Sequence, residues 1–223
     1  MKKTALLAFG TLLISSISAF AVLTLPYADD ATTYQGEMVA TAALTIESDI
    51  NMYGARFSYG VLEDLSLFIG VGLADFDGAD TEPYLQLGGK YTLAVDLPVD
   101  LAVRGAIGFV SFEESFSDGF FSEKYELDIW TLNIGLLASM PIDEAITVYG
   151  FGGISYQNIE AKGRFTETFG GRTFSESFSA SDTETELAIG AGALFTPVEN
   201  IAVGAEIAII DDAFLSLFGR YTF

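Results

Sequence analysis

Large apolar residues alternate with small or polar residues along most of this chain, with a period of two. Residues 65–74 are a clear example, because their odd positions are large and apolar and their even positions are mostly small. Such an alternation indicates β-strands whose two faces meet different surroundings. It predicts ten strands, at residues 36–47, 51–60, 65–74, 83–95, 100–113, 124–140, 145–160, 182–195, 201–210 and 213–223.

The two faces of these strands suit a membrane better than water. Residues 186–195 and 201–209 again set large apolar side chains against Gly, Ala and Glu. A large apolar face fits lipid and a small face fits a narrow lumen, whereas a soluble β-sandwich, the alternative, would carry a charged outer face. The pattern predicts an all-β fold. It is a single antiparallel up-and-down transmembrane β-barrel of ten strands, or of eight if residues 36–47 and one other segment do not cross.

The links between these strands alternate in length. Short turns are expected at residues 62–64, 97–100, 141–144 and 197–200, and longer links at residues 75–82, 114–123 and 160–181. Short periplasmic turns opposite longer outer loops are typical of outer-membrane barrels. Both termini then lie in the periplasm, which requires an even number of strands.

The first 21 residues have the features of a cleaved export signal. Lys2 and Lys3 precede a short apolar stretch, and small residues at Ala19 and Ala21 predict cleavage after Ala21. A short membrane anchor is the alternative. The predicted organisation is a signal peptide (residues 1–21), a short periplasmic lead (residues 22–35) and an integral outer-membrane barrel (residues 36–223).

The charge of the chain restricts its partners. Mean hydropathy is +0.40 although the net charge is −21, and removal of Lys2 and Lys3 leaves 8 basic and 31 acidic residues, or 8 − 31 = −23. Such a chain repels nucleic acid. The expected partners are outer-membrane lipid and lipopolysaccharide, the latter bridged by divalent ions. An acidic loop with Asp75, Asp77 and Asp80 either holds calcium or forms an ordinary Asp-Gly turn, and its spacing is not that of an EF-hand.

The chain contains no His and no Cys. These absences remove imidazole general bases, thiolate nucleophiles and the usual zinc ligands. The omptin proteases and the lipid A palmitoyl- and deacylases resemble this architecture but depend on His. We therefore expect no enzymatic activity, no cofactor and no dedicated metal site.

The last strand carries the clearest resemblance to known proteins. It reads AFLSLFGRYTF, with one face formed by alternate residues that include Tyr221 and the final Phe223. This end resembles the signal that the barrel-assembly machinery of Gram-negative bacteria reads, so that machinery is an expected partner. The mature chain as a whole resembles the OmpA-like and OmpX-like small outer-membrane barrels, including turn phrases such as TPVENIAVGAE, although ten strands would depart from those families.

Charged residues on the small face predict a lumenal network. A charge inside a narrow barrel needs a partner, because its burial alone is costly. We expect an ion-pair network, centred on Arg56, Arg104, Glu206 and Arg220, that plugs the lumen. The alternative is that these side chains line a narrow, cation-preferring pore. The full set of lumenal charges is Arg56, Lys90, Arg104, Glu186, Glu206 and Arg220.

Phenylalanines are concentrated in the two longest links. A Gly170-Gly171 turn would set Glu167 opposite Phe174, whereas a four-residue turn would pair Phe169 with Phe174. An Asp118-Gly119 turn would bring Phe116 and Phe121 together. Both hairpins are expected to extend the barrel sheet beyond the membrane. Their aromatic residues form either a packed ledge or an adhesive surface for an extracellular partner: Phe116, Phe121, Phe165, Phe169, Phe174 and Phe178.

Other aromatic residues lie near the predicted strand ends. They fit interfacial girdles at the two membrane surfaces, or they reflect the ordinary strand propensity of Tyr. The aromatic residues of 145–156 can be assigned to neither face from the pattern. The girdle candidates are Tyr53, Tyr59, Tyr91, Trp130, Tyr149, Tyr156 and Tyr221.

Overall fold

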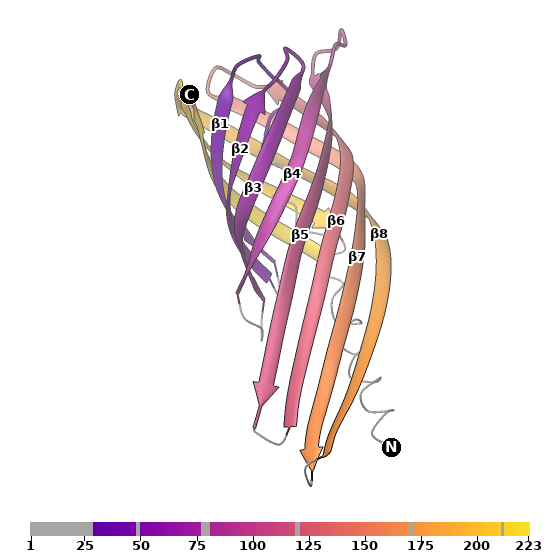
Figure 1. Ribbon diagram of the computed structural model, residues 1–223. Coiled ribbons are helices and arrows are strands. Elements are labelled where there is room, and N and C mark those ends of the chain that lie inside the picture. Colours follow the sequence, from indigo (N-terminus) through magenta and orange to yellow (C-terminus); the bar gives the residue numbers. More distant parts are fainter. Residues whose placement is uncertain (1–28, 48–49, 77–80, 119–120, 170–171, 211) are drawn as a thin grey trace.

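The computed structural model describes residues 29–47, 50–76, 81–118, 121–169, 172–210 and 212–223. These residues form ten antiparallel strands, each paired with its neighbour in the chain, and β1 pairs with β10 so that the sheet closes (Figure 1). The prediction of a ten-stranded barrel is confirmed, and the eight-stranded alternative is wrong. The strands are β1 (Met38–Ile46), β2 (Ile50–Gly60), β3 (Leu65–Phe76), β4 (Glu82–Leu93), β5 (Asp100–Ser117), β6 (Phe121–Pro141), β7 (Ile146–Phe169), β8 (Arg172–Val198), β9 (Ile201–Ile210) and β10 (Asp212–Thr222).

The first and last strands close the barrel with a continuous register. Thr41 lies opposite Arg220, and the Phe223 N–H donates a 2.9 Å hydrogen bond to the Met38 carbonyl. This contact lies at the same end as the short turns β2–β3, β4–β5, β6–β7 and β8–β9. Within the described ranges, no helix has the length and apolar character needed to cross a membrane. The predicted signal peptide lies outside the described residues.

The alternation in the sequence corresponds to the two faces of the barrel wall. Leu67 and Ile69 are about half exposed on the outside (51% and 46%), while Phe68 between them is buried inside. Glycines on the inner face leave room for rings: a Cβ at Gly72 would lie 2.5 Å from the ring of Tyr84. The inner wall is therefore shaped by small residues against a few large ones.

Most of the aromatic residues predicted for the girdles lie on the outer face of the barrel. Trp130 and Tyr156 pack together on neighbouring strands with ring centroids 5.3 Å apart. The assignment is wrong for Tyr149, which is buried and faces the lumen. The side chains exposed outside are Tyr53, Tyr59, Tyr91, Trp130 and Tyr221.

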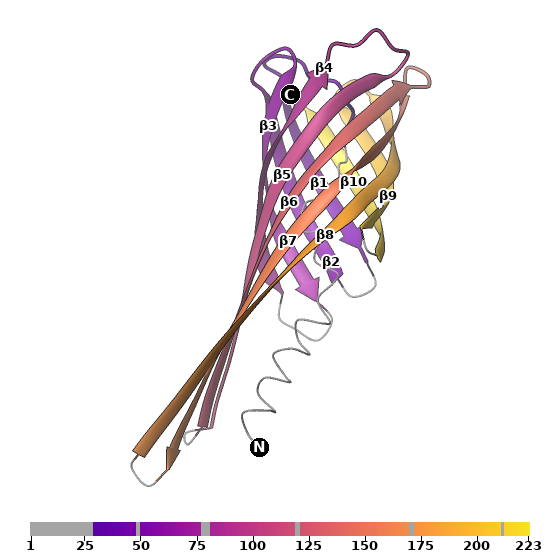
Figure 2. The same cartoon turned by 90° about the vertical axis from the view of Figure 1, so that its right-hand side faces the viewer.

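Four strands continue past the rest of the barrel as a twisted extension of the sheet, which we call the blade (Figure 2). It consists of residues 111–117 of β5, 121–128 of β6, 160–169 of β7 and 172–181 of β8. Pairing of β5 with β4 stops at Val110, and pairing of β9 with β8 begins at Ala188. The expectation that both hairpins continue the barrel sheet is confirmed.

The register of the hairpin formed by β7 and β8 decides between the two turns that the sequence allows. Glu167 lies opposite Phe174 and Phe165 opposite Glu176, as the two-residue turn requires, and the four-residue alternative is wrong. The Gly170-Gly171 turn itself lies outside the described residues, as do Asp77 and Asp80 of the acidic loop.

In the other hairpin the predicted pairing of Phe116 with Phe121 is wrong. Phe116 lies opposite Glu123, because the strand register is shifted by two residues from the predicted one. The Asp118 carboxylate accepts a 2.9 Å hydrogen bond from the Phe121 N–H, which stabilises this register. The side chains of Phe116 and Phe169 lie outside the described residues.

Candidate functional site

The lumen of the barrel is lined by polar side chains that are almost completely buried. They come from the inward positions of the strands, where an isolated polar group would be costly to bury. The set comprises Thr41, Thr45, Arg56, Gln86, Lys90, Arg104, Thr131, Asn133, Ser155, Gln157, Glu206 and Ser216.

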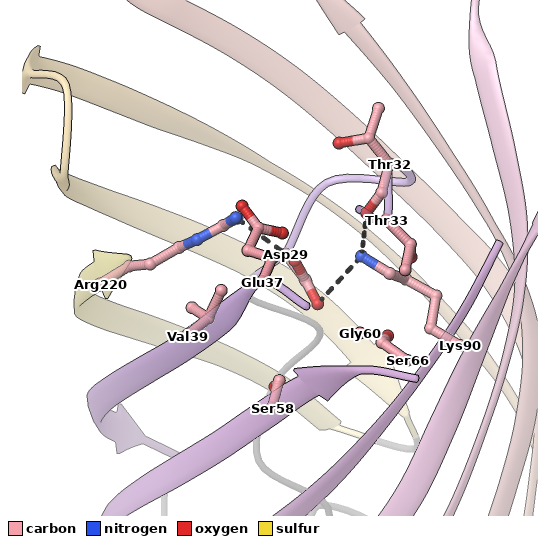
Figure 3. A pocket seen from close by; sticks show the side chains of 10 residues that line it. All are labelled: Asp29, Thr32, Thr33, Glu37, Val39, Ser58, Gly60, Ser66, Lys90 and Arg220. Carbon is pink, nitrogen blue, oxygen red and sulfur yellow. Dashed lines mark hydrogen bonds and ion pairs between the residues drawn. The ribbon is translucent and has the colours of Figure 1, made fainter. Parts of the chain in front are cut away.

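A short segment before β1 lies inside the barrel, and we call it the lumenal segment (residues 29–33). Ala31 is fully buried; its N–H donates to Ser139 Oγ at 2.9 Å, and its carbonyl accepts from the Thr92 hydroxyl at 2.8 Å. Lys90 Nζ donates to the carbonyls of Asp30 and Thr32, each at 2.7 Å. The segment belongs to the predicted periplasmic lead, and the structure places it within the turn end of the barrel (Figure 3).

The carboxylates of this segment meet cations from three strands. Asp29 lies 3.3 Å from Lys90 Nζ, 3.3 Å from Arg220 Nη1 and 3.7 Å from Arg56 Nη2. Asp30 lies 3.1 Å from Arg220 and 3.8 Å from Lys90. These ion pairs are shielded from solvent, so they are screened much less than surface pairs.

Two further groups complete the charged cluster. The guanidinium groups of Arg104 and Arg56 lie over the same Phe68 ring, at 4.8 and 5.2 Å from its centroid, which is cation–π geometry. Glu206 is buried and accepts a 2.7 Å hydrogen bond from the Tyr149 hydroxyl.

The structure places the predicted lumenal charges on the inner wall, but the main counter-charges differ from those expected. Glu186 is half-buried on the lumen face of β8. Sequence reasoning missed Asp29 and Asp30. The signal for them was an imbalance: four basic residues were assigned to the lumen against two acids, and an Asp-Asp pair directly precedes the first strand.

The free space around the cluster is small. The cavity between Asp29, Lys90 and Arg220 measures about 20 Å³, room for about one water molecule. A larger cavity of about 350 Å³ opens beside Asp30 towards the turn end. Burial raises the pKa of Glu37 at this mouth, with Arg220 opposing the shift and Asp30 adding to it.

The inner face of the blade is aromatic. Phe121 and Phe165 pack edge to face with centroids 4.7 Å apart, and Tyr125 and Phe178 lie 6.3 Å apart. Phe174 is 61% exposed. The blade therefore combines a packed aromatic ledge with one strongly exposed ring near its tip.

The outer face of the blade is polar. Lys124 pairs with Glu113 at 2.8 Å, and Lys162 lies 3.3 Å from Asp128 and 3.4 Å from Glu160. The hydrogen bond to Asp128 raises the pKa of Lys162, while desolvation opposes that shift.

The polar positions follow directly after the Trp130 and Tyr156 pair on the same outer face of β6 and β7. An aromatic pair followed by charges is typical of a membrane–water boundary. At the opposite end, the rings of Tyr221 and Phe223 lie 4.8 Å apart and are exposed, at 43% and 66%.

Comparison with known proteins identifies the family. The sequence profile of the family described as "Outer membrane protein beta-barrel domain" matches residues 65–216, which is more than half of the chain. The chain belongs to this family. As an outer membrane protein beta-barrel domain, it is an integral outer-membrane protein. No curated protein sequence matches it.

Several solved barrels are similar to this outer membrane domain in architecture. The N-terminal barrel domain of OprF from Pseudomonas aeruginosa is 14% identical, with 85% of this chain and 98% of that chain covered and a TM-score of 0.38. Ail of Yersinia pestis is 16% identical (85% and 99% covered, TM-score 0.30). The Escherichia coli outer membrane protease OmpT is 12% identical (84% and 94% covered, TM-score 0.49).

Proposed function

We propose that this protein is a closed outer-membrane barrel whose lumen is plugged by its own lumenal segment and which presents the blade outside the cell. The observation that carries the proposal is the set of ion pairs from Asp29 and Asp30 to Arg56, Lys90 and Arg220. The proposal includes export by a signal peptide cleaved after Ala21, so that the mature chain has a free segment ahead of β1.

Physical reasoning favours a structural role for this plug. Cations buried on an inner wall require counter-charges, and removal of one partner of such a pair is strongly destabilising. The lumenal segment supplies those charges and leaves about 20 Å³ beside Lys90, while the cavity of about 350 Å³ beside Asp30 lies towards the turn end. The alternative is a narrow porin-like channel for small cationic solutes, in which the same side chains would line an open path.

Single-channel recording in planar bilayers separates the plug from the channel. The variant lacks residues 24–33 and retains Val22 and Leu23 after the predicted cleavage site. The full-length mature protein should give no stable openings, and the deletion variant should give frequent, resolved openings. Heat-modifiable migration on a denaturing gel verifies that both proteins are folded.

A matched control keeps the segment and changes two exposed acids elsewhere, as Asp96→Asn with Asp212→Asn. This control should stay closed like the full-length protein. Stable openings of the unmodified protein, or a deletion variant that stays closed while folded, would contradict the plug.

A surface-interaction role is a second part of the proposal, supported by the 61% exposure of Phe174 on an otherwise packed aromatic face. Exposed aromatic surface that the fold does not use favours contact with a partner. We propose that the blade contacts an extracellular partner through this ring.

Retention of expressing cells on a polystyrene surface tests the adhesive character of the blade. Phe174→Ser should lower retention. Ser177→Ala, an exposed position on the other face of the same strand, should leave retention unchanged. Equal retention by Phe174→Ser and wild-type cells would count against the role.

The proposal assigns no reaction to the protein, because the chain lacks the His on which barrel enzymes of similar architecture depend. It also assigns Tyr221 and Phe223 to recognition by the barrel-assembly machinery, supported by the exposure of both rings on the outer face of the last strand.

A further inference from the structure

In the charged cluster of the lumen the cations belong to the barrel strands, whereas Asp29 and Asp30 belong to the segment before β1. Arg56, Lys90, Arg104 and Arg220 belong to β2, β4, β5 and β10, so the barrel wall fixes their positions. The segment with Asp29 and Asp30 joins β1 through residues 34–37, and its position in the lumen depends on ion pairs and hydrogen bonds. The cations therefore stay in the lumen whether or not the segment occupies it.

The contacts of the segment resemble those of a bound dianion. Two neighbouring carboxylates share the same two cations, since Lys90 and Arg220 each lie within 3.8 Å of both Asp29 and Asp30. Guanidinium and ammonium groups bind carboxylates in this way in ligand sites, where the charge-assisted bonds are strong.

The charge balance favours an anion when the segment is withdrawn. Without the segment, two acids remain beside the four cations among the described residues of this cluster. They are Glu206, which is hydrogen-bonded to Tyr149, and the half-buried Glu37. Four positive charges then face two negative ones. Low-dielectric walls focus this field along the lumen.

We propose that the cluster of Arg56, Lys90, Arg104 and Arg220 is a binding site for small dicarboxylates, which the carboxylates of Asp29 and Asp30 occupy in the closed barrel. Withdrawal of the segment makes the barrel selective for anions, the reverse of the cation preference that the acidic composition suggests. This inference rests on the proposed plug.

The experiment measures the reversal potential of the variant lacking residues 24–33 in a potassium chloride gradient. The current should be carried mainly by chloride. Succinate on the turn side should block it, because a dicarboxylate binds where chloride passes. In the same background, Lys90→Gln with Arg220→Gln should abolish the chloride preference and weaken the block by about tenfold or more, since each lost charge-assisted bond lowers affinity substantially.

Lys124→Gln serves as the matched control, because it removes a cation of the blade, outside the lumen. It should leave selectivity and block unchanged. Cation-selective openings, or succinate block that survives Lys90→Gln with Arg220→Gln, would overturn the anion site and leave the plug standing. A folded deletion variant with no openings would contradict the plug and the site together.

Titration calorimetry of the folded deletion variant in detergent gives a readout that does not depend on conductance. Succinate should release or absorb heat with a saturable isotherm that is lost in the Lys90→Gln, Arg220→Gln form. An identical isotherm in both forms would also overturn the site.

Discussion

Individual buried charges determine how the lumen is arranged. Phe68 supports two guanidinium groups at 4.8 and 5.2 Å, and such contacts contribute about 2 kcal/mol each when desolvated. Glu206, buried close by, accepts a 2.7 Å hydrogen bond from the Tyr149 hydroxyl. These three charged residues of the inner wall are therefore each tied to a specific neighbour.

Tyr149→Phe tests one of these ties. The variant removes the donor to a buried carboxylate, so it should lower the free energy of unfolding by about 1.5–3 kcal/mol. The measurement is the urea midpoint at which the compact, heat-modifiable gel band disappears. Tyr53→Phe, on the exposed outer face, should change the midpoint little. Equal midpoints for the two variants would count against the hydrogen bond.

Glu37 gives a prediction about pH. Burial raises the pKa of Glu37, so the folded protein favours its protonated form. A carboxyl with a raised pKa contributes stability at low pH, and this contribution is lost as the pH rises through the folded-state pKa. Glu37→Gln should therefore stabilise the barrel at pH 7, and its advantage should shrink below the folded-state pKa. Thermal unfolding of both proteins at pH 7 and at a pH below the folded-state pKa measures the advantage of Glu37→Gln. An advantage that grows on acidification would refute the prediction.

At the scale of elements, the blade depends on close packing across strand pairs. Gly163 lies opposite Phe178, and a Cβ at Gly163 would collide with the Phe178 ring. Glycine at this position lets the ring lie flat on the neighbouring strand. The aromatic ledge therefore stabilises strands that extend beyond the rest of the barrel.

Gly163→Val should displace the Phe178 ring and loosen the blade. Trypsin added to intact cells should then cleave after Lys162 or Arg164 roughly several-fold faster than in the wild-type protein, because cleavage requires local opening of the strands. Ser177→Val, on the polar face of the paired strand, serves as the control. Identical cleavage rates in the two variants would contradict the packing role.

The sequence predicts much of these elements because a period of two specifies both strands and faces. It predicted ten strands, with eight as the alternative, and closure by the last strand, and one of its two registers around Gly170-Gly171 is the observed one. It failed where a local pattern permits two registers or faces, as with Phe116 and Tyr149. Asp29 and Asp30 escaped prediction because the position of a non-strand segment depends on tertiary charge contacts that no periodicity encodes.

In the whole molecule, the wall of the barrel and the blade form one continuous sheet, and the character of both surfaces changes where the barrel wall meets the blade. The outer surface is apolar up to Trp130 and Tyr156 and charged beyond them, while the inner surface combines polar and apolar side chains in the barrel and carries packed aromatic rings in the blade. The lumenal segment lies inside the turn end. The molecule therefore combines a barrel that holds this segment with a sheet that extends beyond the rest of the barrel.

Residues 29–33 lie inside the barrel, and an engineered disulfide tests this position because the chain has no native Cys. The Ala31 N–H lies 2.9 Å from Ser139 Oγ, so Ala31→Cys combined with Ser139→Cys should form a cross-link during export. Ala31→Cys combined with Tyr53→Cys, on the lipid-facing side, should not. The readout is a reducible mobility shift on a denaturing gel. The shift is expected for the first pair alone. Its absence in a folded first pair, or equal cross-linking of both pairs, would show that the segment does not lie in the lumen.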